Sequence, residues 1–283
     1  MSKARELGAH PPRHSVMTDK ALPNPVTEVI ARTGLGARAF VYAAVAWLLL
    51  DGAFSSKSED GASPGDAFRA LENQQGGRIL LVALGIGLFL YALWRFQQAI
   101  ADTEKQGHDA KGILARLGMI SSGTSYFLVG VAAIAVTFGA NNGGDNGGKT
   151  ETTAKWLMEQ PYGRWLVALG GLILIGIGCA QVWRARSGQW KHNIDLSGWA
   201  GRMTPVIATG IAGRGLLFGL VGGFLLLGGL SADQSDIRGL AATLGWIRFQ
   251  PFGLELFLAA ALAIGVYGIY SAVQALRYKF PDS

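Results

Sequence analysis

Two arginines are the residues of this sequence best suited to hold a ligand. Arg38 and Arg214 each lie about one turn inside a run of apolar and small residues. A guanidinium withdrawn from water needs a phosphate, a carboxylate or helix-end carbonyls as its partner. The simpler interpretation is that both side chains snorkel toward cytoplasmic headgroups. The sharper one is that they hold a lipid phosphate or another anionic group between segments of the chain.

Other chemistry has little support. The four histidines all fall in polar tails or loops: His10, His14, His108 and His192. The apolar runs therefore offer no histidine ligands for haem or for a metal. Ser122 and its neighbouring serines have no nearby His or Lys to activate them. The single cysteine, Cys179, lies in an apolar run and is expected to be a packing residue. We expect no enzymatic activity, no cofactor and no bound metal.

The segments that must position the arginines are long apolar runs. Half of the 283 residues are apolar or aromatic, 16% are charged and 41 are glycine, a composition typical of packed transmembrane helices. Six runs are near the roughly 20 residues that cross about 30 Å of hydrocarbon. They are Gly36 to Phe54, Ile79 to Phe96, Leu117 to Ala140, Trp165 to Trp183, Gly215 to Ala232 and Leu256 to Leu276. We predict an all-α integral membrane protein with six transmembrane helices.

The distribution of Lys and Arg predicts the orientation. The N-terminal segment, the loops after the second and fourth runs and the C-terminal segment carry 17 basic residues, against 8 on the other side. By the positive-inside rule, both termini are expected in the cytoplasm. The net charge of +6 therefore reflects orientation and affinity for an anionic inner leaflet, and we expect no nucleic-acid partner.

The polar segments outside these runs are expected to be flexible. Residues 1–30 contain four prolines and lack the apolar region of a signal peptide, which favours a cytoplasmic tail, as does the short segment 278–283. The stretch 141–148 reads NNGGDNGG and is expected to be a linker. A calcium site is the weaker alternative, because Asp145 is its single carboxylate.

Internal repetition is the strongest organising feature. Three segments, 31–101, 115–187 and 207–277, each contain two apolar runs and align with one another. In the first run of each, an aromatic residue follows a glycine by eight positions, at Tyr42, Tyr126 and Phe218. The same alignment places Ser122 of the second repeat opposite Arg38 and Arg214. In the second runs, the aligned positions include Tyr91, Ile177 and Tyr267, and then Gln98, Arg184 and Gln274.

The connection inside each repeat has room for a short helix on the extracytoplasmic surface. Candidate helices follow Pro64, precede Pro161 around Trp156, and include Leu240 and Leu244. We expect them to prop the spanning helices apart, and a substrate gate or a docking surface is the alternative. Since every repeat enters the membrane in the same sense, we expect three parallel two-helix repeats in a pseudo-threefold bundle.

The chain resembles a known family at this level of detail. The Gly, Arg and aromatic pattern of the first helix, the Gly77-Arg78 start of the second and the Tyr91 to Arg95 end resemble bacterial membrane proteins of "domain of unknown function" family 1206. The sequence departs from the pattern at Ser122 and at Leu254. The resemblance implies the three-repeat architecture and a bacterial inner-membrane location, and it implies no activity.

Two functions remain open on the sequence alone. The first is a non-enzymatic structural or accessory subunit, or a lipid-binding component, whose partners are membrane lipids, anionic ones included, and other membrane proteins. The second is a small transporter or channel for an uncharged or lipidic substrate. A polar cavity at mid-depth would favour the second function.

Overall fold

The computed structural model of the protein describes residues 25–54, 64–102, 107, 109–139 and 153–279. The tail up to residue 24, the glycine-rich stretch 141–148 and the last four residues lie outside the described residues. So do His10, His14 and His108. The predictions made for those segments are therefore not addressed by the structure.

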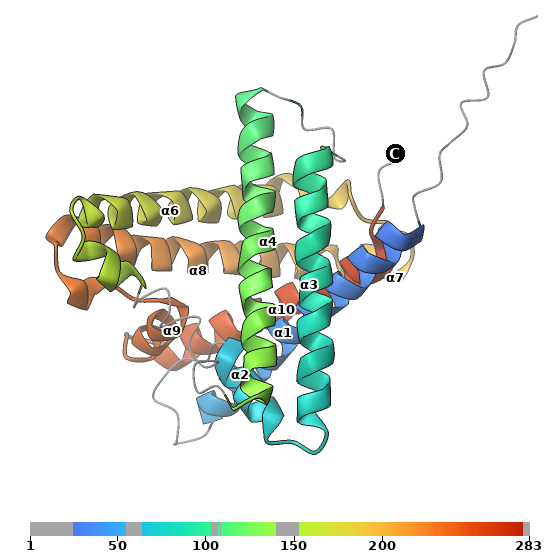
Figure 1. Ribbon diagram of the computed structural model, residues 1–283, viewed down its shortest axis with the longest axis horizontal. Helices are drawn as coiled ribbons and strands as arrows, with labels where there is room; N and C mark the ends of the chain where they lie inside the picture. The colour runs from blue at the N-terminus through green and yellow to red at the C-terminus, as the bar shows by residue number, and fades with distance from the viewer. Residues whose placement is uncertain (1–24, 55–63, 103–106, 108, 140–152, 280–283) are drawn as a thin grey trace, which may run out of the picture.

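Six long helices dominate the described chain (Figure 1). They are α1 (Pro25–Phe54), α3 (Gly77–Ala101), α4 (Ala110–Thr137), α6 (Gly163–Ser187), α8 (Thr204–Ser231) and α10 (Gly253–Arg277). Each is long and apolar enough to cross a membrane. This agrees with the predicted class of an all-α membrane protein with six spanning helices.

Two helices begin well before their apolar runs. α1 starts eleven residues ahead of Gly36 and α8 starts eleven residues ahead of Gly215. Residues 25–30, assigned from sequence to the tail, are thus helical. Arg38 and Arg214 consequently lie in helix interiors instead of near the ends. The apolar runs start later than the helices for the same reason in both cases. The arginine and the polar residues before it lower the local hydropathy.

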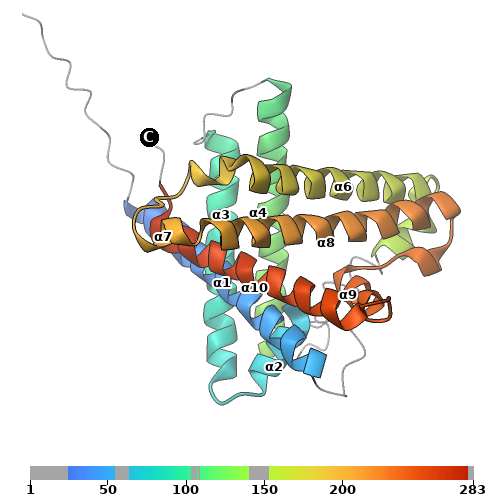
Figure 2. The same ribbon diagram turned by 180° about the vertical axis from the view of Figure 1, so that it is seen from behind.

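The long helices pair across the boundaries between repeats. α3 packs on α4 and α6 packs on α8, and α10 returns to pack on α1. Within repeats, α1 contacts α3 and α8 contacts α10, whereas α4 and α6 make at most marginal contact. By their contacts the helices follow one another in the order α4, α3, α1, α10, α8, α6. In Figure 2, α6, α8, α10 and α1 lie one after another, and α3 and α4 run across them.

The expected pseudo-threefold bundle is not confirmed. The two long helices of the second repeat make at most marginal contact, whereas those of the first and third repeats pack together. In the view of Figure 1, the α3 and α4 pair also runs in a different direction from the α6 and α8 pair. The three repeats are therefore similar in their parts and unequal in their packing.

Short helices occur in all three connections, as the sequence predicts. They are α2 (Pro64–Glu72), a turn and a half at residues 153–158, and η3 (Gln234–Asp236) with α9 (Leu240–Arg248). Phe68 of α2 and Leu244 of α9 are fully buried in the largest apolar core, with side chains of α1, α4 and α10. These helices thus anchor the spanning helices to one another through apolar contacts.

The same turn leads into the second long helix of every repeat. It consists of a residue with positive φ followed by a glycine: Gly76-Gly77, Tyr162-Gly163 and Phe252-Gly253. A methyl group on the second residue would lie 1.8, 1.6 and 2.1 Å from a backbone oxygen of the preceding short helix. The recurring glycine is therefore required by this close approach.

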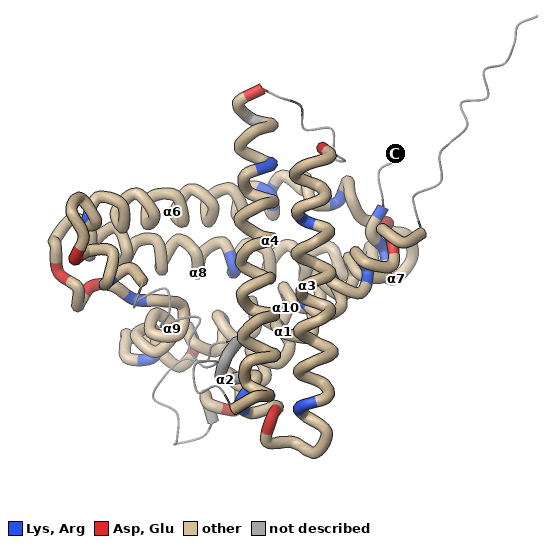
Figure 3. Tube along the Cα trace, in the orientation of Figure 1, with Lys and Arg blue, Asp and Glu red and all other residues tan. Residues whose placement is uncertain are grey.

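Charged residues gather at the ends of the long helices and in the connections, with few in between (Figure 3). Removing Arg38 and Arg214 from the 17 basic residues of the predicted cytoplasmic side still leaves 15 against 8. The positive-inside argument therefore survives the placement of these arginines. Cys179, expected to pack inside, is exposed instead, on the outer surface of α6.

Candidate anion-binding site

Arg38 is the most deeply buried charge in the described chain. It is the fourteenth residue of α1, and its side chain is only 5% exposed. Its Nε donates to Ser271 Oγ at 3.1 Å, and Nη1 donates to Tyr91 Oη at 2.6 Å. Nη2 donates to Gln274 Oε1. The guanidinium is thus held by α3 and α10, with its carbon 5.0 Å from the centre of the Tyr91 ring.

Arg214 reaches the same region from α8. Its Nε donates to Tyr42 Oη at 3.1 Å and its Nη1 donates to Gln181 Oε1 at 2.8 Å. No described residue bonds to its Nη2, and the side chain keeps partial exposure. Its guanidinium carbon stands 4.5 Å from the centre of the Tyr267 ring and 4.3 Å from that of Phe218. One edge of this cation therefore remains available.

Tyrosines connect the two arginines. The hydroxyl groups of Tyr42 and Tyr126 are 2.9 Å apart. The Tyr126 ring packs edge-on against Tyr91, with centres 4.7 Å apart, and Tyr42 packs likewise on Tyr267 at 4.9 Å. Both guanidinium groups lie near the Tyr267 ring, that of Arg38 at 5.8 Å. We call Arg38, Arg214 and these four tyrosines the central cluster.

The charge of the central cluster is uncompensated. Every hydrogen-bond partner of the two guanidinium groups in the described chain is neutral: serine, tyrosine or glutamine. Burying one guanidinium costs several kcal/mol, which an opposite charge normally offsets. Aromatic faces contribute about 0.5–2 kcal/mol each and do not neutralise the charge. Two such cations beside each other create a strongly positive interior that favours an anion.

The structure brings the two sequence-predicted arginines together at one site. The snorkelling interpretation is wrong, since both guanidinium groups bond to side chains of other helices inside the protein. Contact with lipid phosphate stays a prediction. The sequence did not single out their polar partners, Gln181, Ser271 and Gln274, as site residues.

A signal for most of the cluster was nevertheless present in the repeat alignment. The positions of Arg38, Tyr42 and Tyr91 in the first repeat correspond to those of Arg214, Phe218 and Tyr267 in the third. In the second repeat, Tyr126 also joins the cluster through its hydroxyl, which lies against that of Tyr42. Side chains at equivalent positions of the repeats thus meet in the central cluster.

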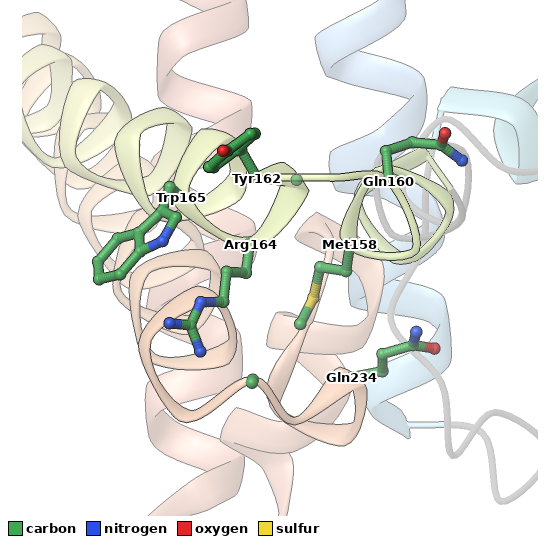
Figure 4. A pocket seen from close by; sticks show the side chains of 8 residues that line it. Met158, Gln160, Tyr162, Arg164, Trp165 and Gln234 are labelled. Atoms are coloured by element: carbon green, nitrogen blue, oxygen red, sulfur yellow. The ribbon is translucent and has the colours of Figure 1, made fainter.

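A second candidate lies at the other end of α6. A pocket of about 390 Å³ is lined by the start of α6 and the turn after α8 (Figure 4). Arg164 and Met158 project into it, and Gln160 and Gln234 lie at its rim. Arg164 is exposed and stacks on Trp165 at 4.8 Å. Because water competes for an exposed arginine, we consider the central cluster the stronger site.

Metal chemistry finds no support in the described residues. They contain no group of three or more His, Cys, Asp or Glu side chains that could hold an ion. The one histidine described, His192, lies exposed in the loop after α6. The chemistry available at the central cluster is therefore hydrogen-bond donation and positive charge.

The fold and the cluster define a class: a helical membrane protein of three two-helix repeats with cationic side chains buried where they meet. The chain belongs to the family described as "Domain of Unknown Function (DUF1206)", which matches residues 33–102, 117–188 and 209–277. It is similar to "Uncharacterized protein YxxB" of Bacillus subtilis (strain 168), at 30% identity over 246 residues, covering 86% of this chain and 84% of the relative. No solved structure matches it.

Proposed function

We propose that the protein is a non-enzymatic membrane protein that binds an anionic lipid through its central cluster. The observation that carries this proposal is the uncompensated pair Arg38 and Arg214, whose described partners are all neutral. A bound phosphate would supply the missing negative charge. It would also accept hydrogen bonds from the edge of Arg214 that has no partner in the described chain.

A phosphate diester suits this site chemically. Arginine binds phosphate oxygens in a planar, two-point geometry, and charge-assisted hydrogen bonds contribute about 1.5–3 kcal/mol each. Tyrosine hydroxyls can donate to the remaining oxygens once they are released from each other. The surrounding rings exclude water, which strengthens both kinds of contact. Loss of one such bond would weaken binding roughly tenfold to hundredfold.

The wider setting is part of the proposal. We place the protein in a bacterial inner membrane with both termini in the cytoplasm, on the bias of basic residues toward that side. There it would serve as an accessory subunit or a lipid-binding component, with anionic lipids and other membrane proteins as partners. The exposed apolar faces of α4 and α6 are available for such contacts.

Native mass spectrometry tests lipid binding directly. The protein would be purified in mild detergent, given phosphatidylglycerol or phosphatidylcholine, and analysed for bound lipid. We expect retention of phosphatidylglycerol in preference to phosphatidylcholine. Arg38→Gln and Arg214→Gln should each reduce that retention at least about tenfold, because each removes charge and donors while keeping a polar side chain.

The matched control is Arg78→Gln, which removes an arginine that is 71% exposed at the start of α3. It should leave lipid retention unchanged. Thermal unfolding of all three variants identifies any loss that arises from misfolding. Equal retention of phosphatidylglycerol by folded Arg38→Gln and Arg214→Gln would refute the proposal.

Lipid transport is a second candidate function. It is favoured by the position of the cluster, which lies in helix interiors and is built from all three repeats, as substrate sites of repeat-built transporters are. In vesicles containing fluorescent phosphatidylglycerol, a transporter would speed the exchange between leaflets, and Arg214→Gln would abolish that acceleration. Binding without exchange would leave the accessory or lipid-binding role.

A further inference from the structure

The second repeat departs from the other two around the central cluster. Its helices α4 and α6 make at most marginal contact, whereas the helices of the first and third repeats pack together. The positions that align with the arginines and with Tyr91 and Tyr267 hold Ser122 and Ile177. Ile177 is 41% exposed, while Tyr91 is fully buried. We call the two helix faces that carry Ser122 and Ile177 the open side.

The central cluster and Gln181, a hydrogen-bond partner of Arg214, reach both edges of the open side. Gln181 lies one turn beyond Ile177 on α6, and Tyr126 lies one turn beyond Ser122 on α4, so each pair shares a helix face. A chain of hydrogen bonds runs from Gln181 through Arg214 and Tyr42 to Tyr126, with lengths of 2.8, 3.1 and 2.9 Å. Arg214 therefore sits at the inner limit of the open side.

Apolar residues line the approach. Spanning helices α4 and α6 are the two least buried of the six. Ile173 and Ile177, one turn apart on α6, are 55% and 41% exposed. An apolar surface that ends at an uncompensated cation matches an amphiphile with a hydrocarbon chain and an anionic head.

We propose that an anionic lipid occupies the open side with its acyl chain along α4 and α6 and its phosphate at Arg214, so that it enters from the bilayer through the second repeat. This inference rests on the proposed function and adds the route and the position of the chain. The occupant is a lipid and not a second protein copy, because a second copy would have to bring a negative charge to Arg214 across an apolar surface.

The experiment uses one substitution that fills the open side and one that does not. Ile177→Trp adds bulk next to the cluster without touching either arginine. Leu172→Trp adds the same bulk to an exposed site of α6, about 140° around the helix. In native mass spectrometry with phosphatidylglycerol, we expect Ile177→Trp to lose the retained lipid and Leu172→Trp to keep the wild-type amount.

A second measurement needs no tryptophan variant. Phosphatidylglycerol with a photoreactive group in its acyl chain should label peptides of α4 and α6 in the wild type. This specific labelling should disappear in Arg214→Gln, while the general labelling of the other helices persists. It reports the position of the chain even where a tryptophan variant fails to fold.

The outcomes separate the two proposals. Full lipid retention by folded Ile177→Trp, together with lipid loss in the arginine variants, would overturn the route and leave the proposed function standing. Retention in the arginine variants would overturn both. A lipid-free dimer whose α4 and α6 crosslink between copies would assign the open side to a second protein molecule and also overturn the inference.

Discussion

All three repeats share one turn, but the second repeat differs from the other two in the side chains that it places near the centre of the molecule. All three repeats enter their second long helix through a residue with positive φ and a glycine packed on a carbonyl oxygen. In the first and third repeats, an arginine and a tyrosine then extend into the central cluster. In the second, Ser122 and Ile177 occupy those positions and its two helices separate. The turn therefore follows from backbone geometry and is common to all three repeats. The two long helices of a repeat pack together only where the inner positions hold an arginine and a tyrosine.

The largest loss of stability is expected at the glycine of the turn that all three repeats share. Gly163→Ala places a methyl group 1.6 Å from the oxygen of Leu157, and Gly77→Ala and Gly253→Ala create similar overlaps. Each should lower the free energy of unfolding by about 3 kcal/mol, since the overlap is with backbone. Unfolding in mixed detergent and SDS micelles measures this. Wild-type stability of any one of the three would show that its repeat uses a different turn.

The next effect contrasts the aligned positions Arg38 and Ser122. Arg38→Ala leaves the buried groups of Tyr91, Ser271 and Gln274 without their donor, and we expect a loss of about 2 kcal/mol. Ser122 is half-buried on α4 and Ser122→Ala removes only a small hydroxyl group, so it should cost about 1 kcal/mol or less. The same unfolding assay compares them. Equal costs would mean that the cluster does not depend on the arginine.

A smaller difference is expected between two tyrosines that bond to each other. Tyr42→Phe removes the acceptor of Arg214 as well as the bond to Tyr126, whereas Tyr126→Phe removes only the latter. Tyr42→Phe should therefore be less stable than Tyr126→Phe by about 1 kcal/mol. Unfolding of both variants and of the double variant tests this. A double variant no worse than Tyr42→Phe would agree with one shared bond.

The smallest effect is expected on the exposed face of α6, opposite the face that packs on α8. A Cβ atom at Gly176 or Gly170 of α6 would meet nothing within 4 Å. Alanine there should raise the free energy of unfolding by about 0.5–1 kcal/mol through helix propensity alone. Gly178→Ala is the contrast, because its Cβ would lie 2.5 Å from the backbone oxygen of Gly215 on α8. A loss of stability in Gly176→Ala would reveal a contact on the exposed face.

The fold was largely predictable because hydrophobicity and repetition are local properties of the sequence. Six spans, three repeats and the short helices in the connections all follow from runs of residue types. The pairing of α10 with α1 could not be read in this way, since it joins opposite ends of the chain. Nor could the separation of α4 from α6, which is a property of packing.

The candidate site was predictable only in its charges. Arg38 and Arg214 stood out as cations in apolar runs, but hydropathy placed them near helix ends because it registers charge and not the partners that bury it. Their partners come from other helices, up to 236 positions away in the sequence. Aligned tyrosines marked the inner faces of the repeats, and the structure supplied the arrangement that joins them.

The distance along the chain between Arg38 and its partners on α10 has a consequence for biosynthesis. Ser271 is made 233 residues after Arg38. At about 5–20 residues per second, the arginine waits roughly 12–50 seconds for that partner. During this interval the guanidinium must stay hydrated or be sheltered by the insertion machinery. The last helix to leave the ribosome is thus the one that completes the surroundings of the first, and chains released early would be marked for quality control by an unsheltered charge.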